Sequence, residues 1–282
     1  MLLRLFLASR PQFLTASLVP VLVAGAYVKW LGTNPPLDLW LLTLLGMALL
    51  QAAANLLNDY FDHMSMADDV NRDFVRPFSG GARMIQQGSV SPHEVLFAGL
   101  LCLAVGSGLG LYLAMTRGLM ILLLGLFGVV TLFFYTAPPL SLGYRGLGEI
   151  FIFLDFGVLP MLGTEYVLTQ QFTVRMLVLS LPVGLMIAAL LWVNQFPDAD
   201  ADAMVGKRHL VVILGRPGAA RALCWMYGVA FTLVAVLVSV LWLPWYALVA
   251  LVAALPAGVA MQRLTDRPED PAAWKEACPA GV

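Results

Sequence analysis

Long apolar runs alternate with short polar segments along most of the chain. A helix that crosses the hydrocarbon core of a membrane needs roughly 20 apolar residues, and eight runs approach or reach that length. A chain in lipid must satisfy its backbone hydrogen bonds internally, so runs of this length indicate helices rather than a barrel. The pattern predicts an all-α integral membrane protein, a bundle of about eight transmembrane helices. The predicted spans are residues 12–31, 38–57, 92–114, 118–136, 149–169, 176–195, 222–241 and 244–261.

The composition supports the same class of protein. Hydrophobic residues make up 60% of the 282 residues and charged residues 12%, whereas soluble globular domains contain roughly 25% charged residues. The net charge of −1 gives no reason to expect a nucleic-acid partner. Cys102, Cys224 and Cys278 lack the spacing of a metal site, and we expect buried, inert thiols. The expected surrounding of the chain is therefore a lipid bilayer.

The basic residues predict how the chain is oriented in the membrane. With the N-terminus inside, only Lys29, Arg117 and Arg175 of the 16 basic residues fall in outer segments, which leaves the other 13 inside. This asymmetry follows the positive-inside rule. We therefore expect a bacterial inner or plasma membrane, with the N-terminus and the long polar loops at 58–91 and 196–221 facing the cytoplasm.

An acidic run follows the second apolar span. Residues 55–81 read NLLNDYFDHMSMADDVNRDFVRPFSGG and contain five of the 17 acidic residues. If the helix of the span continues, Asn58 and Asp62 share one narrow face with Asn55 and Asp59. Like charges stacked at a membrane surface repel each other and favour a bridging divalent cation, and oxygen ligands of this kind suit Mg²⁺. Taken alone, the run is more simply explained as a solvated acidic loop.

A second run of the same kind, residues 194–208 (NQFPDADADAMVGKR), follows the sixth span. We predict that Pro197 begins a new helix, because its missing N–H has no cost there. Asn194, Asp198 and Asp202 follow one another at intervals of four, which is the spacing of three oxygen ligands on one side of a helix. Two such runs at equivalent ends of two spans predict a paired cation site. The basic residues beside the runs fit either phosphate capture or binding of anionic lipid.

The acidic ends, the nearby basic residues and the apolar bundle together describe a pocket for a molecule with a diphosphate head and a long apolar tail. Mg²⁺ would hold the diphosphate and neutralise charge on it as a leaving group. If the adjoining carbon is allylic, departure of the diphosphate leaves a cation that aromatic faces such as Tyr60, Phe61 and Tyr135 stabilise. An electron-rich acceptor then attacks that carbon. Ionisable residues are costly inside a span, so Asp155 is a candidate acceptor contact, whereas Glu165 is interpreted as interfacial.

Several motifs resemble those of a known family. NDYFD at 58–62, VNQFPDADAD at 193–202 and GKR at 206–208 resemble the two aspartate-rich motifs of the UbiA superfamily of intramembrane aromatic prenyltransferases. RPFSGG at 76–81 is similar to the basic loop of that family, and YTAPP at 135–139 to its Tyr segment. The most similar branch prenylates 1,4-dihydroxy-2-naphthoate in menaquinone synthesis. The resemblance implies helices around a central cavity that opens to the cytoplasmic side.

The resemblance also implies roles for individual residues. The substrates are a polyprenyl diphosphate and an aromatic acceptor, 1,4-dihydroxy-2-naphthoate or a similar quinone precursor, joined through an allylic cation. Asp62, Asp198 and Tyr135 are the implied catalytic residues. The implied Mg²⁺ ligands are Asn58, Asp62, Asp68, Asn194, Asp198 and Asp202. The implied diphosphate contacts are Asn58, Asn194, Arg76, Lys207 and Arg208.

Two features depart from the family pattern. Ser141 stands where many relatives have a lysine, and we expect Arg145 to replace that diphosphate contact. The family usually has nine spans, whereas here residues 263–282 form a polar tail after a single transmembrane domain of residues 1–262. We interpret the tail as a shortened last loop and expect a less completely closed bundle.

Other classes of membrane protein share parts of this pattern. A cation-coupled transporter would place its carboxylates near the middle of the membrane, on discontinuous helices. A CDP-alcohol phosphotransferase would also use Mg²⁺ and carboxylates, but its DGxxAR signature is missing from the chain. A non-catalytic relative that binds quinone or isoprenoid lipid is the third alternative. Nothing in the sequence specifies the oligomeric state or the length of the prenyl chain.

Overall fold

The computed structural model describes residues 1–281, which form helices and connecting loops without a strand. Each of the eight predicted runs coincides with a helix or a succession of helices, and four runs extend one or two residues past the helix ends. Seven of these are long and apolar enough to cross a membrane, and α6, with 16 residues, is shorter. The spans are α2 (Leu14–Trp30), α3 (Leu37–Met64), α5 (Pro92–Arg117), α6 (Leu119–Phe134), α7, η3 and α8 (Gly148–Phe153, Leu154–Val158 and Leu159–Thr169), α9 (Val174–Met204), α10 (Leu210–Ser239), and η4 with α11 (Trp245–Ala253 and Ala254–Asp266). The short elements are α1 (Leu2–Ala8), η1 (Pro11–Phe13), α4 (Ala67–Val70), η2 (Leu142–Tyr144) and α12 (Pro271–Gly281).

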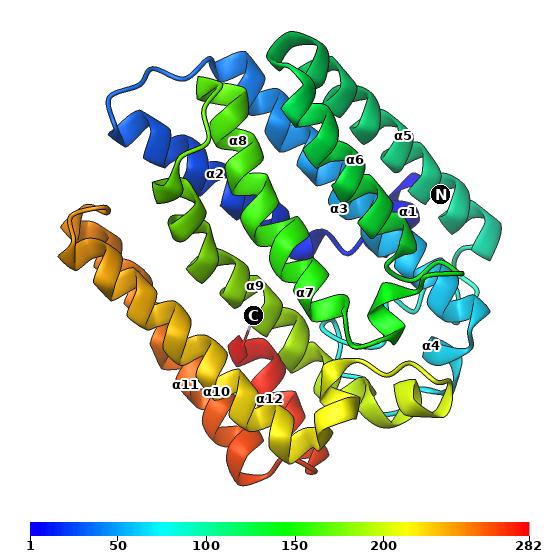
Figure 1. Ribbon diagram of the computed structural model, residues 1–282. Helices are drawn as coiled ribbons and strands as arrows, with labels where there is room; N and C mark the ends of the chain where they lie inside the picture. The colour runs from blue at the N-terminus through cyan, green and yellow to red at the C-terminus, as the bar shows by residue number, and fades with distance from the viewer. Residues whose placement is uncertain (282) are drawn as a thin grey trace.

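Helix α9 lies in the middle of the bundle. Figure 1 shows α2 and α8 on one side of it and α10, α11 and α12 on the other, with α3, α5 and α6 forming a further group. Gly157 of η3 and Gly184 of α9 allow the two backbones to approach closely, because a Cβ added to Gly157 would overlap Gly184. The central position of α9 lets it contribute side chains both to the core and to a site at its end.

Two helices extend beyond the thickness of a membrane. Helix α3 has 28 residues and α9 has 31; at 1.5 Å per residue they are about 42 Å and about 46 Å long, against a hydrocarbon core of about 30 Å. Helix α3 continues through Asp62 and α9 through Asp202, so these aspartates occupy ordered helical turns at the ends of spans. The predicted continuation of the first span through Asp62 is confirmed.

The prediction that Pro197 begins a helix is wrong. Pro197 lies inside α9, which runs without interruption from Val174 to Met204. Proline has no N–H to donate to the carbonyl four residues earlier, and that carbonyl, on Val193, instead accepts from the Cys278 thiol of α12 at 3.8 Å. The freed backbone group thus has a partner from another element, which explains how the proline is accommodated inside the helix.

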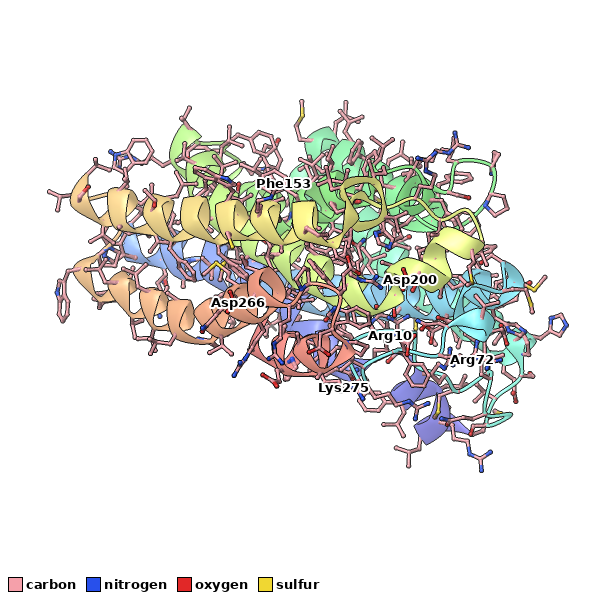
Figure 2. All side chains as sticks on the ribbon, turned by 90° about the horizontal axis from the view of Figure 1, so that it is seen from below. Arg10, Arg72, Phe153, Asp200, Asp266 and Lys275 are labelled. Atoms are coloured by element: carbon pink, nitrogen blue, oxygen red, sulfur yellow. The ribbon has the colours of Figure 1, made fainter. Side chains whose placement is uncertain are left out.

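The predicted polar tail contains a helix. Residues 271–281 form α12, and Figure 2 shows this helix against α11 in the view from below. Trp274 and Cys278 of α12 are buried in one core cluster with Phe196 of α9 and Tyr227 of α10. The charged residues around α12 hide its apolar face in the sequence, because only two of its four buried positions, Trp274 and Cys278, are larger than alanine.

Arg216 connects α9 and α10 to the C-terminal segment that contains α12. Its side chain, at the start of α10, donates to the Phe196 carbonyl of α9 at 3.1 Å and lies over the Trp274 ring at 4.3 Å. The same guanidinium forms ion pairs with Asp200 at 3.1 Å and Glu269 at 3.0 Å. One buried cation therefore links α9 and α10 to the segment that leads into α12.

Candidate functional site

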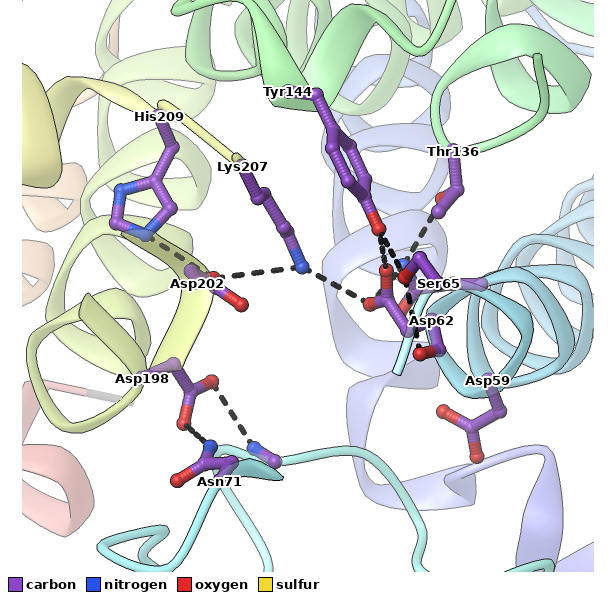
Figure 3. Close-up of polar contacts among 12 residues, drawn as sticks. Asp59, Asp62, Ser65, Asn71, Thr136, Tyr144, Asp198, Asp202, Lys207 and His209 are labelled. Carbon is purple, nitrogen blue, oxygen red and sulfur yellow. Dashed lines mark hydrogen bonds and ion pairs between the residues drawn. The ribbon is translucent and has the colours of Figure 1, made fainter. Parts of the chain in front are cut away.

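The acidic ends of α3 and α9 meet at Lys207. Its Nζ lies 3.0 Å from Asp62 Oδ2 and 3.5 Å from Asp202 Oδ2, and Figure 3 shows it between these two carboxylates. Burial lowers the pKa of Lys207, but the Asp202 and Asp62 carboxylates outweigh burial and hold that pKa well above its usual value. Lys207 is therefore a fixed positive charge that joins two segments far apart in the sequence.

Both oxygens of the Asp62 carboxylate are held by hydrogen bonds. The Tyr144 hydroxyl donates to Oδ1 at 2.9 Å, and the Asn58 amide donates to Oδ2 at 3.0 Å. The Asn58 amide also donates to the Thr136 hydroxyl at 3.0 Å. The Tyr144 hydroxyl lies 2.7 Å from Ser65 Oγ, so this ring is itself fixed. The Asp62 carboxylate consequently has a defined orientation at the end of α3.

The Asp198 carboxylate is held by the loop that follows α4. The Asn71 amide donates to Oδ1 at 2.7 Å, and the backbone N–H of Gly80 donates to Oδ2 at 3.1 Å. Gly80 and Gly81 both have φ +72°, which L-residues rarely adopt, and a Cβ on Gly81 would overlap the Asp68 carboxylate. The two glycines of the RPFSGG segment are thus needed to bring the loop against the acidic helix ends.

An arginine with 13% of its side chain exposed pairs with the first acidic run. Arg10 forms an ion pair with Asp59 and donates to Asn58 Oδ1 at 2.9 Å. The backbone N–H of Ala82 donates to the second Asp59 oxygen at 3.0 Å. Asp59 therefore has its own partners, while Asn58 and Asp62 on the same helix face the space next to them.

Asp68, at the start of α4, adds a further carboxylate. The group is buried, and burial together with the nearby Asp62 and Asp59 charges raises its pKa well above the usual value. Burial is the larger of these causes, and the two neighbouring carboxylates add negative charge beside Asp68. A cation that entered here would be stabilised.

The two acidic ends line a single cavity of about 160 Å³. Four carboxylates and two cationic side chains, Arg10 and Lys207, face it. The opposite wall is apolar, so the cavity joins a charged end to a hydrophobic one. The apolar wall is formed by Phe13, Ile152, Phe156, Ile187, Leu190 and Leu191.

Most of the residues predicted from the sequence lie at this cavity, and three do not. The lining includes Asn58, Asp62, Asp68, Tyr135, Asn194, Asp198, Asp202 and Lys207. Arg76 is exposed and lies over the Phe74 ring at 5.7 Å. Arg145 is exposed and donates to the Pro139 carbonyl at 2.9 Å. Arg208 is exposed, and its backbone N–H donates to the Tyr144 carbonyl at 3.0 Å.

Sequence reasoning missed several residues of the site. Arg10 was counted only among the inner basic residues, although it pairs with an aspartate 49 positions away. His209 caps α10 and its Nε2 lies 3.2 Å from Asp202 Oδ2. Arg10 directly precedes the first span and His209 directly follows GKR. These positions next to the motifs are the sequence features that could have identified both residues as part of the site. Asn71 and Gly80 lie in the first acidic run without a signal of their own, and Tyr144 lies just beyond the YTAPP segment.

The donor set suits a hard cation that completes its shell with a bound substrate. Asn194 Oδ1 is buried without a hydrogen-bond partner, as expected of an oxygen reserved for a ligand. Within residues 1–281, no three acidic, imidazole or thiol groups already converge on one point. Mg²⁺ binds through one or two carboxylates, water and substrate phosphates, and the oxygen-rich cavity fits that mode.

Comparison with protein families and with characterised proteins gives consistent results. The model of the UbiA prenyltransferase family matches residues 17–277, which includes most of α12. A 1,4-dihydroxy-2-naphthoate octaprenyltransferase from Bacillus subtilis is 28% identical over 223 residues, covering 79% of this chain and 70% of the relative. The Escherichia coli enzyme of the same name is 31% identical over 221 residues, covering 75% and 68%. A 2-carboxy-1,4-naphthoquinone phytyltransferase from Synechocystis is 29% identical over 263 residues, covering 92% and 82%.

Solved structures share the fold. A UbiA homolog from Aeropyrum pernix aligns with a TM-score of 0.70 at 18% identity, covering 96% of this chain and 95% of the other. A UbiA homolog from Archaeoglobus fulgidus, solved with DMAPP and Mg²⁺, aligns with a TM-score of 0.68 at 16% identity and covers 99% of each chain. The helical arrangement, the paired acidic helix ends and the family match over most of the chain agree. The chain belongs to the UbiA prenyltransferase family.

Proposed function

We propose that this membrane-embedded prenyltransferase transfers a polyprenyl group from a polyprenyl diphosphate to an aromatic acceptor of the 1,4-dihydroxy-2-naphthoate class, and that it requires Mg²⁺. The observation that carries the proposal is the shared cavity: Asp62 from α3 and Asp198 from α9 line one space that is charged at one end and apolar at the other. A diphosphate with a hydrocarbon tail is likewise charged at one end and apolar at the other. The names of the sequence relatives support the acceptor class.

The charge of the cavity supports a role for a divalent cation. Four carboxylates and two cationic side chains line it, so an anionic diphosphate would be repelled without added positive charge. The residues that would hold Mg²⁺ are Asn58, Asp62 and Asp68 on one side and Asn194, Asp198 and Asp202 on the other. Bound Mg²⁺ supplies charge neutralisation for the departing diphosphate. Binding of Mg²⁺ and DMAPP by the Archaeoglobus homolog supports the same requirement.

Lys207 and Tyr135 have separate proposed roles. Lys207 lies at the charged end with 16% of its side chain exposed, and it carries a positive charge that diphosphate oxygens can share. Tyr135 faces the cavity and is held by Gly143 and Gly148, where an added Cβ would lie 3.0 Å from its ring and 2.9 Å from its hydroxyl. An aromatic face at a fixed position stabilises a nearby carbocation.

The proposed transfer breaks one carbon–oxygen bond and forms one carbon–carbon bond. The bond between the allylic carbon and the diphosphate oxygen breaks, and the electron pair leaves with the diphosphate. A ring carbon of the acceptor then forms a bond to the allylic carbon. That ring carbon loses the group it carried, a proton or its carboxyl group as carbon dioxide, and aromaticity is restored. The apolar wall excludes water that would otherwise capture the cation.

The proposed orientation follows from the basic residues. Lys207 and Arg10 lie at the same charged end of the cavity, and the distribution of basic residues along the chain favours this end as the cytoplasmic one. Both acidic runs lie near the ends of α3 and α9 rather than at broken mid-membrane helices, which favours an enzyme over the ion-coupled transporter considered from the sequence.

The activity is tested with purified protein, a polyprenyl diphosphate, 1,4-dihydroxy-2-naphthoate and Mg²⁺, with the product followed by mass spectrometry. We expect a prenylated product and a loss of at least about 100-fold for Asp62→Asn or Asp198→Asn. Asp69→Asn is the matched control, because Asp69 belongs to the same acidic run but pairs with His63 at 2.9 Å outside the cavity. Absence of product with any aromatic acceptor, or full activity of both cavity variants, contradicts the proposal.

A further inference from the structure

A second cavity, of about 150 Å³, lies between α3, α5, α6 and the η3–α8 segment. These helices contact one another at one side of the bundle (Figure 1). Its lining is apolar apart from Thr43, Thr164 and Asp155, and it contains Gly46, Gly106, Gly110, Gly125, Gly128 and Gly163. A carboxyl group in such a cavity, within a membrane span, is energetically costly, and residues of this kind usually have a function.

Asp155 is the free hydrogen-bonding group of this cavity. The Thr43 hydroxyl donates to the Leu39 carbonyl at 2.8 Å, and the Thr164 hydroxyl donates to the Pro160 carbonyl at 2.6 Å. Thr131 of α6 contacts Asp155, but its hydroxyl also donates to carbonyls of its own helix. Asp155 Oδ1 is buried and has no partner. The cavity therefore offers an unused acceptor and no free donor among its lining side chains.

The apolar lining and the single unpaired oxygen of Asp155 together indicate the kind of ligand that the cavity would bind. A cavity of roughly 150 Å³ holds a molecule about the size of an aromatic ring, and a buried water molecule usually needs about three polar partners, more than this cavity provides. A prenyl tail has no donor and would leave the Asp155 oxygen unsatisfied. An aromatic ring with a hydroxyl group fills the apolar space and supplies the missing donor.

The second cavity adjoins the charged one. Phe156 lines both cavities, and Asp155 is the residue before it on the π-helical turn Leu154–Val158. A ring bound beside Asp155 would therefore lie next to the apolar wall of the cavity that holds the prenyl donor. We propose that this second cavity is the acceptor site and that Asp155 recognises a hydroxyl group of the aromatic acceptor. The proposal rests on the proposed prenyltransferase function and assigns its acceptor-specificity residue.

The role of Asp155 is tested by the kinetics of two substitutions. Asp155→Leu removes the acceptor oxygen, and we expect the KM for 1,4-dihydroxy-2-naphthoate to rise about ten-fold with the KM for the prenyl diphosphate unchanged. Asp155→Asn keeps a carbonyl oxygen and should restore most of the affinity. Asp38→Asn, an exposed carboxylate at the start of α3, is the control. An unchanged acceptor KM in a folded Asp155→Leu variant overturns the proposal.

A chemical test needs no substitution at Asp155. We expect wild-type protein to discriminate about ten-fold between 1,4-dihydroxy-2-naphthoate and one of its two monomethyl ethers, which lacks that donor, and Asp155→Leu to lose the discrimination. Equal use of the acceptor and both ethers by wild-type protein overturns the proposal. Because every comparison requires product from the wild type, failure of the prenyltransferase function itself appears separately, as absence of any product.

Filling the cavity distinguishes an acceptor from a prenyl tail. Gly128 lines the cavity, and a Cβ added there would meet no atom within 4 Å, so Gly128→Leu adds bulk at the cavity wall without a clash at its first atom. We expect a raised KM for the acceptor and an unchanged preference for prenyl chain length. A selective loss of the longer prenyl diphosphates would assign the cavity to the tail and overturn the proposal.

Discussion

The two acidic runs reach the same cavity by different routes. In the second run, Asn194, Asp198 and Asp202 lie on one uninterrupted helix, so the helical repeat alone sets their spacing. In the first run, Asn58 and Asp62 lie on α3, but Asp68 lies beyond the end of that helix on the short α4. One half of the site is therefore formed by a helix, and the other half depends on a loop.

Tertiary contacts hold the loop half in place. Arg83 donates to the Asp68 carbonyl and, at 3.0 Å, to the Asn71 carbonyl. Gly80 donates to Asp198 of the helical half at 3.1 Å. The difference indicates that the helix alone positions the α9 side chains, whereas the position of Asp68 depends on contacts that a substitution in the loop can remove.

The largest effect is expected at the residue that joins the halves. Lys207→Met leaves the Asp62 and Asp202 carboxylates without their shared cation. We expect kcat/KM to fall about 100-fold and the folded state to lose about 3 kcal/mol, since breaking a buried ion pair leaves an uncompensated charge. Mg²⁺ should raise the melting temperature of this variant more than that of the wild type. Lys275→Met, an exposed lysine on α12, is the control, and equal melting temperatures for both variants contradict the expectation.

A smaller effect is expected in the loop half. Gly81→Ala introduces a Cβ that overlaps Asp68 at a backbone φ of +72°. Gly88→Ala is a matched control, because Gly88 has φ +64° with no atom within 4 Å of an added Cβ. Both variants should lose about 1 kcal/mol of folding free energy through backbone strain, but only Gly81→Ala should lose activity, about ten-fold. Equal activity in the two variants would show that the loop half does not depend on this glycine.

The smallest effect on activity is expected at Arg216, which does not line the cavity. Arg216→Met removes the contacts to Phe196, Trp274 and the two acidic partners. Because Asp200 and Glu269 are largely exposed, their ion pairs contribute little, and we expect a loss of about 1 to 2 kcal/mol in folding free energy, mainly from the Phe196 carbonyl. Activity should change less than three-fold (about 0.6 kcal/mol). The comparison variant is Arg221→Met on the exposed face of α10, and thermal denaturation measures the difference.

The parts of the fold that follow a local repeat could be predicted from the sequence. The apolar runs located all eight helical segments, and the four-residue spacing of Asn194, Asp198 and Asp202 placed three side chains at one cavity. The start of a helix at Pro197 was predicted wrongly, because the partner that accommodates the proline, Cys278, comes from a helix 81 positions later. Helix α12 was not predicted either, because its small apolar face is visible only against the core it covers.

The features of the site that were not predicted depend on contacts between elements that are distant in the sequence. Nothing in a single sequence couples Arg10 to Asp59, or His209 to the orientation of Asp202. Arg76, Arg145 and Arg208 have the charge expected of diphosphate ligands, but the loops that carry them turn their side chains outward. Lys207, which lines the cavity, therefore has more structural support as a diphosphate ligand than these three arginines. Asp155 was noticed from the sequence by its cost in a membrane span, but its empty apolar neighbourhood required the structure.

The proposal that α3 and α9 share one Mg²⁺-diphosphate is tested by binding of an unreactive prenyl thiolodiphosphate in a double-mutant cycle. Calorimetry would compare wild type, Asp62→Asn, Asp198→Asn and the double variant, with and without Mg²⁺. We predict that each single substitution removes most of the Mg²⁺-dependent binding and that the double variant binds no more weakly than the weaker single one. Two independent, additive losses, or unchanged binding in either single variant, would contradict a common site.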